Sequence, residues 1–348
     1  MRKKRRTISV GNVDIGGDNE ISIQSMTNTK TSDIKTTVAQ ILDLEKEGCE
    51  IIRVAVPDVD SANAIKEIKS KINIPIIADI HFDHRLALRS VENGADGLRL
   101  NPGNIKKKRY IKLVVNKAKE KNIPIRIGVN AGSIDRKRYK HPTPEALVDS
   151  ALNHIKILEK MNYENIKVSL KSYDVNTTIK SYELFSNIRD YPLHVGITEA
   201  GDFFKGSIRS SIGIGILLYK GLCDTFRVSL TADPVKEVMV AKEILNSLNI
   251  RQFGIDIISC PTCGRTEIDI SKIVQTVKER TRDINANLKV AIMGCAVNGP
   301  GEARDADIGI AGGKKEGLLF EKGEIIGKYP EDKLIELLIE RIKKYEND

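Results

Sequence analysis

Three cysteines and one glutamate in the last part of this 348-residue chain have the types and spacing of ligands to one metal centre. Cys260 and Cys263 belong to a Cys-Pro-Thr-Cys turn, Cys295 follows in a distant segment, and Glu302 ends the loop Asn298-Gly-Pro-Gly-Glu302. Glycine and proline in that loop disfavour a regular helix. Three thiolates and one oxygen ligand suit an iron–sulfur cluster with one chemically distinct iron. Such a centre would be a reaction site as well as an electron carrier.

Two other interpretations of these cysteines stay open. A Cys-x-x-Cys pair also occurs in redox dithiols of the thioredoxin type, but this leaves Cys295 and Glu302 without a role. A structural zinc site would use the same pair, although zinc ribbons usually add a second close pair and Cys295 stands alone. Cys49 and Cys223 end apolar helical stretches and are expected to be structural. Cys223 is kept as a reserve candidate for the fourth ligand.

The composition is that of a globular chain without a membrane segment. Hydrophobic residues make up 41% of the sequence, which is enough for a sizeable core. No apolar run approaches the roughly 18–20 residues that span a bilayer. The basic start Met1-Arg-Lys-Lys-Arg-Arg6 is not followed by the apolar region of a secretory signal. Five unevenly spaced cysteines fit a reducing compartment, so we predict a cytoplasmic protein that does not bind membranes.

The net charge of +9 admits nucleic acid, an acidic lipid surface or an anionic small substrate as partner. Many of the cations fall on predicted helix surfaces such as 105–121, where a solvated face explains them. Tryptophan is absent and aromatic residues total 5%, which leaves few platforms on which nucleobases could stack. We therefore expect an anionic small molecule and no nucleic-acid partner.

Short apolar runs alternate with amphipathic helical segments over the first two-thirds of the chain. The predicted strands are 21–26, 51–56, 74–80, 97–100, 125–129, 166–170, 193–197 and 225–230. Nearly continuous apolar strands that alternate with helices favour a parallel sheet covered on both faces. Eight such units predict an α/β fold, a (β/α)8 TIM-type barrel over residues 1–254. An open doubly wound sheet is the alternative, but no Gly-x-Gly-x-x-Gly turn follows the first strand.

A small α+β domain is predicted for residues 255–348. Strands at 255–259 and 289–293 would deliver Cys260 and Cys295 at their ends, with a helix at 271–282 between them. Further strands are expected at 308–311 and 317–320, and a closing helix at 331–345. The proposed ligands would therefore lie in loops that directly follow strands.

Polar or charged side chains stand within or just after nearly every predicted barrel strand, at the end where barrel active sites form. They are Arg53, Asp79, His81, Arg99, Asn101, Arg126, Asn130, Lys171, Ser172, Glu199, Arg227 and Ser229. Four of them predict an anion site: Arg53, Arg99, Arg126 and Lys171. Arginine matches phosphate oxygens with two hydrogen bonds and lysine adds a compact charge, so a diphosphate or bisphosphate fits. Glu199 is a candidate general acid or base, with a salt bridge as the structural alternative.

Several longer motifs resemble one known family, the 4-hydroxy-3-methylbut-2-enyl diphosphate synthases. The motifs are Ser259-Cys-Pro-Thr-Cys-Gly-Arg265, Gly294-Cys-Ala-Val-Asn-Gly-Pro-Gly-Glu-Ala303, Val195-Gly-Ile-Thr-Glu-Ala-Gly201, Arg227-Val-Ser-Leu-Thr-Ala-Asp-Pro234, Leu98-Arg-Leu-Asn-Pro-Gly-Asn104 and Ile23-Gln-Ser-Met-Thr-Asn-Thr29. The resemblance covers nearly the whole chain, and the compact length is similar to the two-domain bacterial form of the family.

This resemblance implies an oxidoreductase of the non-mevalonate isoprenoid pathway. It would reductively open 2-C-methyl-D-erythritol 2,4-cyclodiphosphate and release (E)-4-hydroxy-3-methylbut-2-enyl diphosphate and water, with two electrons from ferredoxin or flavodoxin. It also implies a [4Fe-4S] cluster in domain 255–348, ligated by Cys260, Cys263, Cys295 and Glu302. The expected assembly is a homodimer in which the cluster domain of one chain caps the barrel of the other.

The resemblance also implies roles for single residues. Glu302 would be a displaceable cluster ligand, and Glu199 would protonate the departing oxygen, so both are predicted to be catalytic. The predicted substrate-binding residues are Arg53, Arg99, Arg126, Asn130, Lys171 and Ser229.

Overall fold

The computed structural model describes residues 2–100, 105, 107–134, 136–284, 286–295, 301 and 303–346. The chain divides into two compact units, Met1–Ile244 and Leu245–Asp348. Buried hydrophobic clusters occur within each unit, so each has a core of its own. Within the described ranges, no helix combines the length and the apolar character that crossing a membrane requires.

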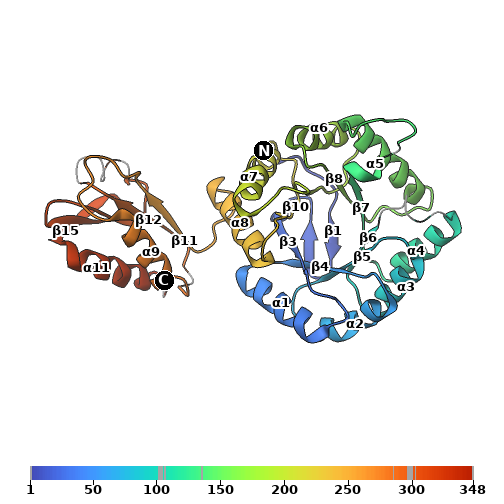
Figure 1. The fold of residues 1–348 in the computed structure, drawn as a ribbon, viewed down its shortest axis with the longest axis horizontal. Helices are drawn as coiled ribbons and strands as arrows, with labels where there is room; N and C mark the ends of the chain where they lie inside the picture. The colour runs from blue at the N-terminus through green and yellow to red at the C-terminus, as the bar shows by residue number, and fades with distance from the viewer. Residues whose placement is uncertain are drawn as a thin grey trace. The chain divides into compact units, whose positions relative to one another are not determined.

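The first unit is a barrel of parallel strands surrounded by helices (Figure 1). Its sheet has the strand order β8-β7-β6-β5-β4-β3-β10-β9, and a parallel bridge from Val168 to Leu193 links the two ends. The strands are β3 (Ser22–Met26), β4 (Ile51–Ala55), β5 (Ile76–Ile80), β6 (Gly97–Leu100), β7 (Ile125–Asn130), β8 (Ile166–Lys171), β9 (His194–Val195) and β10 (Thr225–Phe226). This confirms the predicted eight-stranded barrel.

Helices follow the barrel strands in regular alternation. They are α1 (Ile34–Glu47), α2 (Val59–Lys69), α3 (His84–Glu92), α4 (Lys108–Glu120), α5 (Pro144–Glu159), α6 (Val175–Ser186), α7 (Phe203–Tyr219) and α8 (Pro234–Ser247), with the short 3-10 turn η2 (Ala131–Ser133) after β7. Several begin at an aspartate whose carboxylate accepts a backbone N–H of the first turn, as Asp33, Asp58 and Asp174 do. Each cap satisfies an orphan donor and fixes the point at which a loop becomes a helix.

A hairpin that the sequence patterns did not predict covers the N-terminal end of the barrel. Strands β1 (Ile8–Val10) and β2 (Val13–Ile15) pair antiparallel, and their apolar side chains pack against Ile51 of β4 and Ile77 of β5. Strands of three residues are too short to show a periodicity. The hairpin places a hydrophobic plug at the end of the barrel opposite the strand-end polar residues.

The basic run before this hairpin is bound to the barrel. Arg2 Nη2 lies 2.6 Å from Asp224 Oδ1, and Arg5 Nη1 lies 3.3 Å from Oδ2 of the same carboxylate. Asp224 is fully buried and also accepts the backbone N–H of Leu193 at 2.7 Å. Arg2 and Arg5 therefore anchor the N-terminal segment to the barrel. Their charges are neutralised within the protein, whereas the composition alone also allowed them to bind an external anionic partner.

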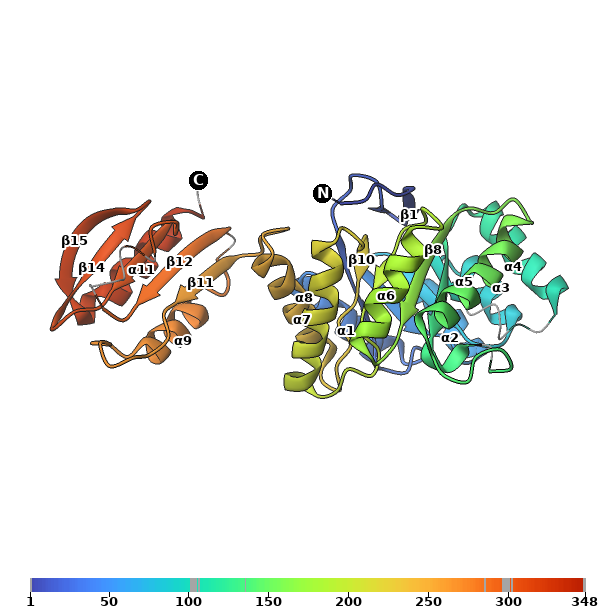
Figure 2. The ribbon, with the colours of Figure 1, turned by 90° about the horizontal axis from the view of Figure 1, so that it is seen from above.

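The second unit is a mixed sheet covered on one face by two helices (Figure 2). Its strands lie in chain order, β11 to β13 parallel and β13 to β15 antiparallel. The elements are β11 (Ile255–Ser259), α9 (Ile270–Arg280), β12 (Leu288–Met293), β13 (Ile308–Ala311), β14 (Glu316–Glu321), β15 (Glu324–Pro330) and α11 (Glu331–Lys344). Val277 of α9 and Leu338 of α11 share one buried cluster with the sheet. The predicted α+β domain is confirmed, and β15 is an addition to it.

We expect Asp224→Asn to lower the free energy of unfolding of the barrel by about 3–5 kcal/mol, because it leaves buried Arg5 without a countercharge. Urea unfolding followed by tyrosine fluorescence measures this loss, since the chain contains no tryptophan and seven of its nine tyrosines lie before residue 245. Asp18→Asn is the matched control, because Asp18 pairs with Lys4 on the exposed surface. Equal effects of the two substitutions would contradict an anchoring role for Asp224.

Candidate functional site

Cationic side chains from several strands gather inside the C-terminal mouth of the barrel. Arg53 of β4, Arg99 of β6 and Arg126 of β7 share a ring with Lys171 of β8 and with Arg227, which directly follows β10. Because side chains alternate along a strand, the residues directly before and after each of these cations point away from this interior. The structure thus brings together the four cations predicted as an anion site and adds Arg227 to them.

Asp79 of β5 holds two of these arginines. Its Oδ1 lies 3.0 Å from Arg99 Nη1 and its Oδ2 lies 3.5 Å from Arg53 Nε. Burial alone would raise the pKa of the Asp79 carboxyl, but the charges of Arg53, Arg99 and Arg126 outweigh it, and the pKa is lowered. Asp79 is therefore an ionised carboxylate that holds Arg99 and Arg53 in position. The sequence pattern placed Asp79 among the strand-end polar residues but did not identify its arginine partners.

The cations outnumber the carboxylates, and burial together with this excess of positive charge lowers the pKa of several of them. Burial, followed by repulsion from Arg227 and Arg99 against the attraction of Asp79, lowers the pKa of Arg53 to about 10. Burial and repulsion from Arg126 and other arginines lower the pKa of Lys171 well below its usual range. Within the described residues, Arg126 Nε and Nη1 have no hydrogen-bond partner. A bound polyanion would reduce the repulsion among the cations and would accept hydrogen bonds from Arg126 Nε and Nη1.

Arg227, the fifth cation of the cluster, forms an ion pair with Glu237 of α8. The Glu237 carboxylate lies 3.1 Å from Arg227 Nε and accepts the backbone N–H of Leu230 at 2.9 Å. Met26 of β3 completes the floor, since its sulfur accepts from Arg53 Nη2 at 2.9 Å and Arg227 Nη1 at 3.4 Å. Sequence reasoning missed Glu237, because an acidic residue in the first turn of a helix looks like an ordinary favourable dipole partner.

Gly196 leaves room for the lysine of the cluster. A Cβ at this position would lie 2.6 Å from Lys171 Nζ and 2.5 Å from the Arg227 carbonyl oxygen, closer than real Cβ atoms come. Glycine is therefore required by close approach. Lys171 reaches the interior of the mouth through the space that the missing side chain leaves.

The other predicted barrel residues lie at the same end of the strands. Asn130 ends β7 as the ladder partner of Lys171, and its backbone N–H donates to Ser133 Oγ at 2.9 Å. Ser229 is half-buried in the segment after β10. Asn101 lies outside the described residues.

Glu199 stands in the loop after β9 with its side chain exposed and a backbone φ of 54°. A left-handed conformation is uncommon for a residue other than glycine, and such strain concentrates at functional sites. The structure gives Glu199 no ion pair with any described residue, so the salt-bridge alternative has no support. Its carboxylate stands beside a mouth that is otherwise cationic.

Two of the predicted cluster ligands stand at the ends of neighbouring strands of the second unit. Cys260 directly follows β11, Cys295 follows β12, and the two strands pair in parallel. The backbone N–H of Gly294 donates to Cys260 Sγ at 3.2 Å. Cys263 is exposed, and hydrogen bonds from the backbone and side chain of Arg265 lower the pKa of its thiol. The lowered pKa of the Cys263 thiol and the N–H···S bond to Cys260 suit thiolate ligation to iron.

Glu302 lies outside the described residues, as do positions 296–300. Among the residues that are described, no three histidine, cysteine or acidic side chains are assembled as a metal site. The complete ligand set therefore remains a prediction.

The remaining cysteines are structural in the barrel unit. The Cys49 thiol donates to the Ile51 carbonyl at 3.2 Å, and burial raises its pKa to about 12. Cys223 is 1% exposed and points at the carbonyl of Thr225, and burial raises its pKa as well. Both are protonated thiols in the core, which disfavours Cys223 as a ligand.

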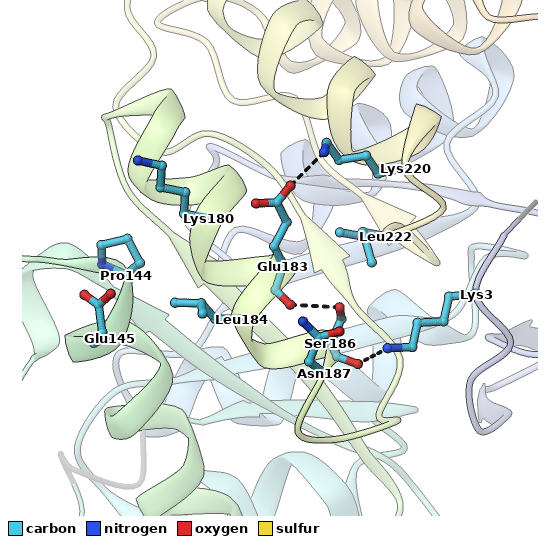
Figure 3. Close-up of a pocket in the computed structure, with 10 residues that line it drawn as sticks. All are labelled: Lys3, Pro144, Glu145, Lys180, Glu183, Leu184, Ser186, Asn187, Lys220 and Leu222. Atoms are coloured by element: carbon cyan, nitrogen blue, oxygen red, sulfur yellow. Dashed lines mark hydrogen bonds and ion pairs between the residues drawn. The ribbon is translucent and has the colours of Figure 1, made fainter.

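A surface hollow of about 650 Å³ lies elsewhere, on the outside of the barrel unit (Figure 3). It is lined by side chains such as Leu184 and Asn187 at the end of α6 and Leu222 after α7, and Glu183 pairs with Lys220 across it at 2.9 Å. None of the strand-end residues lines it. The concentration of charge at the mouth, rather than the size of this hollow, identifies the candidate site.

Comparison with known families and proteins covers the whole chain. The family described as the GcpE TIM-barrel domain matches residues 5–242, and the GcpE protein C-terminal domain matches residues 256–344. A protein of Clostridium perfringens named 4-hydroxy-3-methylbut-2-en-1-yl diphosphate synthase (flavodoxin) is 56% identical over 98% of this chain and 99% of its own. A protein of Caldanaerobacter subterraneus with the same name is 57% identical over 99% of this chain and 98% of its own.

Solved structures similar to the barrel are only distantly related in sequence. The dihydropteroate synthase of Yersinia pestis superposes with a TM-score of 0.52 at 10% identity, over 71% of this chain and 99% of that chain. The Xanthomonas albilineans dihydropteroate synthase gives 0.52 at 11% identity, over 71% of this chain and 99% of that chain. At this level of identity the likeness concerns the barrel fold alone.

We expect Gly196→Ala to weaken the binding of inorganic diphosphate at least about tenfold, because the new methyl group displaces Lys171 Nζ or the Arg227 carbonyl. Isothermal titration calorimetry at low ionic strength measures this affinity. Gly215→Ala in α7 is the control, since nothing lies within 4 Å of its Cβ. That control should keep the affinity and stabilise the helix by roughly 0.5–1 kcal/mol. Unchanged binding by the Gly196 variant would show that Lys171 does not contact the anion.

Proposed function

The chain belongs to the GcpE family, and we propose that it acts as a 4-hydroxy-3-methylbut-2-en-1-yl diphosphate synthase in isoprenoid biosynthesis. The reaction is the reductive ring opening and dehydroxylation of 2-C-methyl-D-erythritol 2,4-cyclodiphosphate, an oxidoreductase reaction. The structural observation that best supports this chemistry is the cation cluster at the barrel mouth. It offers a cyclic diphosphate more positive charge than the two nearby carboxylates neutralise.

The charge balance of the reaction matches this site. Breaking the bond between C2 and its phosphate oxygen turns a cyclic diester into a terminal phosphate. Two electrons and one proton enter, the C3 hydroxyl leaves as water, and the product carries one more negative charge than the substrate. Arg53, Arg99 and Arg126 can hold the diphosphate before and after opening, because guanidinium groups bind phosphate oxygens with two hydrogen bonds. Lys171, Asn130 and Ser229 would complete the contacts at the strand ends.

Reduction requires a redox centre, and the second unit offers residues suited to one. A [4Fe-4S] cluster held there would supply electrons one at a time and an iron that can bind a substrate oxygen. The residues that would hold it are Cys260, Cys263, Cys295 and Glu302. Placement of two thiols on neighbouring strand ends, and the N–H of Gly294 on one of them, support this assignment. A carboxylate is easier to displace than a thiolate, which gives Glu302 a purpose.

Glu199 is the candidate proton donor to the leaving oxygen. It follows β9 at the mouth, its strained backbone turns the side chain into solvent, and no described residue neutralises it. A general acid must reach the departing oxygen without being held elsewhere, and an unpaired carboxyl on a mouth loop meets this condition.

The electron donor is proposed to be flavodoxin, because the relatives are named as flavodoxin enzymes. This narrows the earlier choice between ferredoxin and flavodoxin. A homodimer is the proposed assembly, and it would bring the cluster unit of one chain to the mouth of another and exclude water from the reaction. Reduced thiols at Cys49 and Cys223 accord with the proposed cytoplasmic location.

Metal analysis and turnover of protein purified without oxygen test the proposal. We expect about four irons and four sulfides per chain and conversion of the cyclodiphosphate with reduced flavodoxin. Glu302→Gln should keep most of the iron and lose most of the turnover, whereas Cys263→Ser should lose both. Zinc without sulfide would instead support a barrel enzyme with a structural zinc site. Full turnover by the Glu302 variant would contradict the displaceable ligand.

Glu199→Gln should reduce turnover by about 10²- to 10⁴-fold, the usual contribution of general acid–base catalysis. Affinity for inorganic diphosphate should change little, because the cation cluster is intact. Comparing single-turnover rates with calorimetric binding separates the two effects. Glu145→Gln on the surface of α5 is the control and should match the unaltered enzyme. A parallel loss of binding and rate would make Glu199 a binding residue.

A further inference from the structure

A lysine is buried inside the barrel beside the cation cluster, four residues before Lys171 on β8. Lys167 of β8 is 1% exposed, and its Nζ has no hydrogen-bond partner among the described residues. It is the ladder partner of Arg126, which in turn pairs with Arg99. Lys167 and Lys171 are four residues apart on one strand, so they share the inward face. A fully buried amine without a partner is costly, and packing alone does not explain it.

The groups that face Lys167 come from every side of the barrel interior. Arg126 of β7 and Arg53 of β4 repel its charge, and Asp224 at the start of β10 attracts it. His194 of β9 is fully buried with both ring nitrogens unpartnered, and it lies within electrostatic reach of Lys167 and Lys171. The only carboxylate in this set, Asp224, is already bound by two arginines from the start of the chain.

Lys167 is 1% exposed, has no hydrogen-bond partner among the described residues and is the ladder partner of Arg126, and this environment disfavours the charged amine while the mouth holds no anion. Burial comes first and repulsion from Arg126 and Arg53 second among the causes that lower the pKa of Lys167 well below its usual range. A polyanion on Arg126 and Arg53 would cancel the repulsion at its source. The sign follows directly: added negative charge stabilises the protonated amine, so a proton is taken up.

We propose that Lys167 is a positioning residue that takes up a proton when a diphosphate binds the neighbouring cation cluster. The proposal rests on the proposed diphosphate site and adds a residue to which neither the resemblance nor the comparisons point. Lys167 does not contact the reacting carbon atoms. It acts through Arg126, by letting the barrel interior gain positive charge when negative charge arrives. Since ring opening adds a further negative charge, the same amine would favour the opened product over the cyclic substrate.

Proton-linked calorimetry with inorganic diphosphate tests the proposal on the full chain. Binding is measured in buffers of different ionisation enthalpy across the neutral to mildly alkaline range, which gives the number of protons taken up. We expect Lys167→Met to take up fewer protons than the unaltered protein, by as much as about one per diphosphate. Lys112→Met, on the exposed surface of α4, should leave the proton count unchanged.

Lys167→Arg provides a second test that does not remove the positive charge. Arginine stays protonated, so this variant should also lose the proton uptake while it keeps diphosphate affinity. If both Lys167 variants take up as many protons as the unaltered protein, the inference is overturned. If the unaltered protein does not bind diphosphate at all, the proposed substrate site is wrong instead.

Discussion

Repulsion among like charges inside a closed barrel is the constraint on which the rest of this structure depends. Four cations on strands and Arg227 directly after β10 face one another inside the barrel, and among the described residues only Asp79 and Glu237 form ion pairs with them. In a medium of low dielectric such crowding is costly. Asp79 and Glu237 offset part of this cost by binding Arg53, Arg99 and Arg227. In the proposed function, the residual charge lowers stability at the place where the diphosphate would bind.

The barrel and its cation cluster could be predicted from sequence because both are local patterns. Apolar runs alternate with helices, and charged residues at strand ends meet at the mouth of any such barrel. The compensating residues could not be predicted in the same way. Glu237 binds Arg227 from a helix turn, and Asp224 binds Arg2 across more than two hundred positions. These pairings depend on three-dimensional closure, and a charged residue in isolation looks like surface.

The second unit illustrates the opposite case. Its cysteines were singled out as candidate ligands from their spacing, and the parallel pairing of β11 with β12 explains why Cys260 and Cys295, 35 positions apart, follow neighbouring strands. Parallel strands need a crossover, and α9 supplies it. The weakly patterned β15 escaped prediction because its side chains are mostly exposed and carry no apolar face. The cysteines of this unit stand out in the sequence by their type and spacing, whereas the strand at its far edge does not.

The attachment of Arg2 and Arg5 to Asp224 also bears on synthesis. Arg2 and Arg5 bind a carboxylate that the ribosome adds more than two hundred positions later. At a synthesis rate of roughly 5–20 residues per second, Asp224 is added on the order of ten to forty seconds after Arg2 and Arg5. During that interval Arg2 and Arg5 lack the carboxylate that they bind in the folded barrel. The N-terminal segment can therefore take its final attachment only after Asp224 has been made.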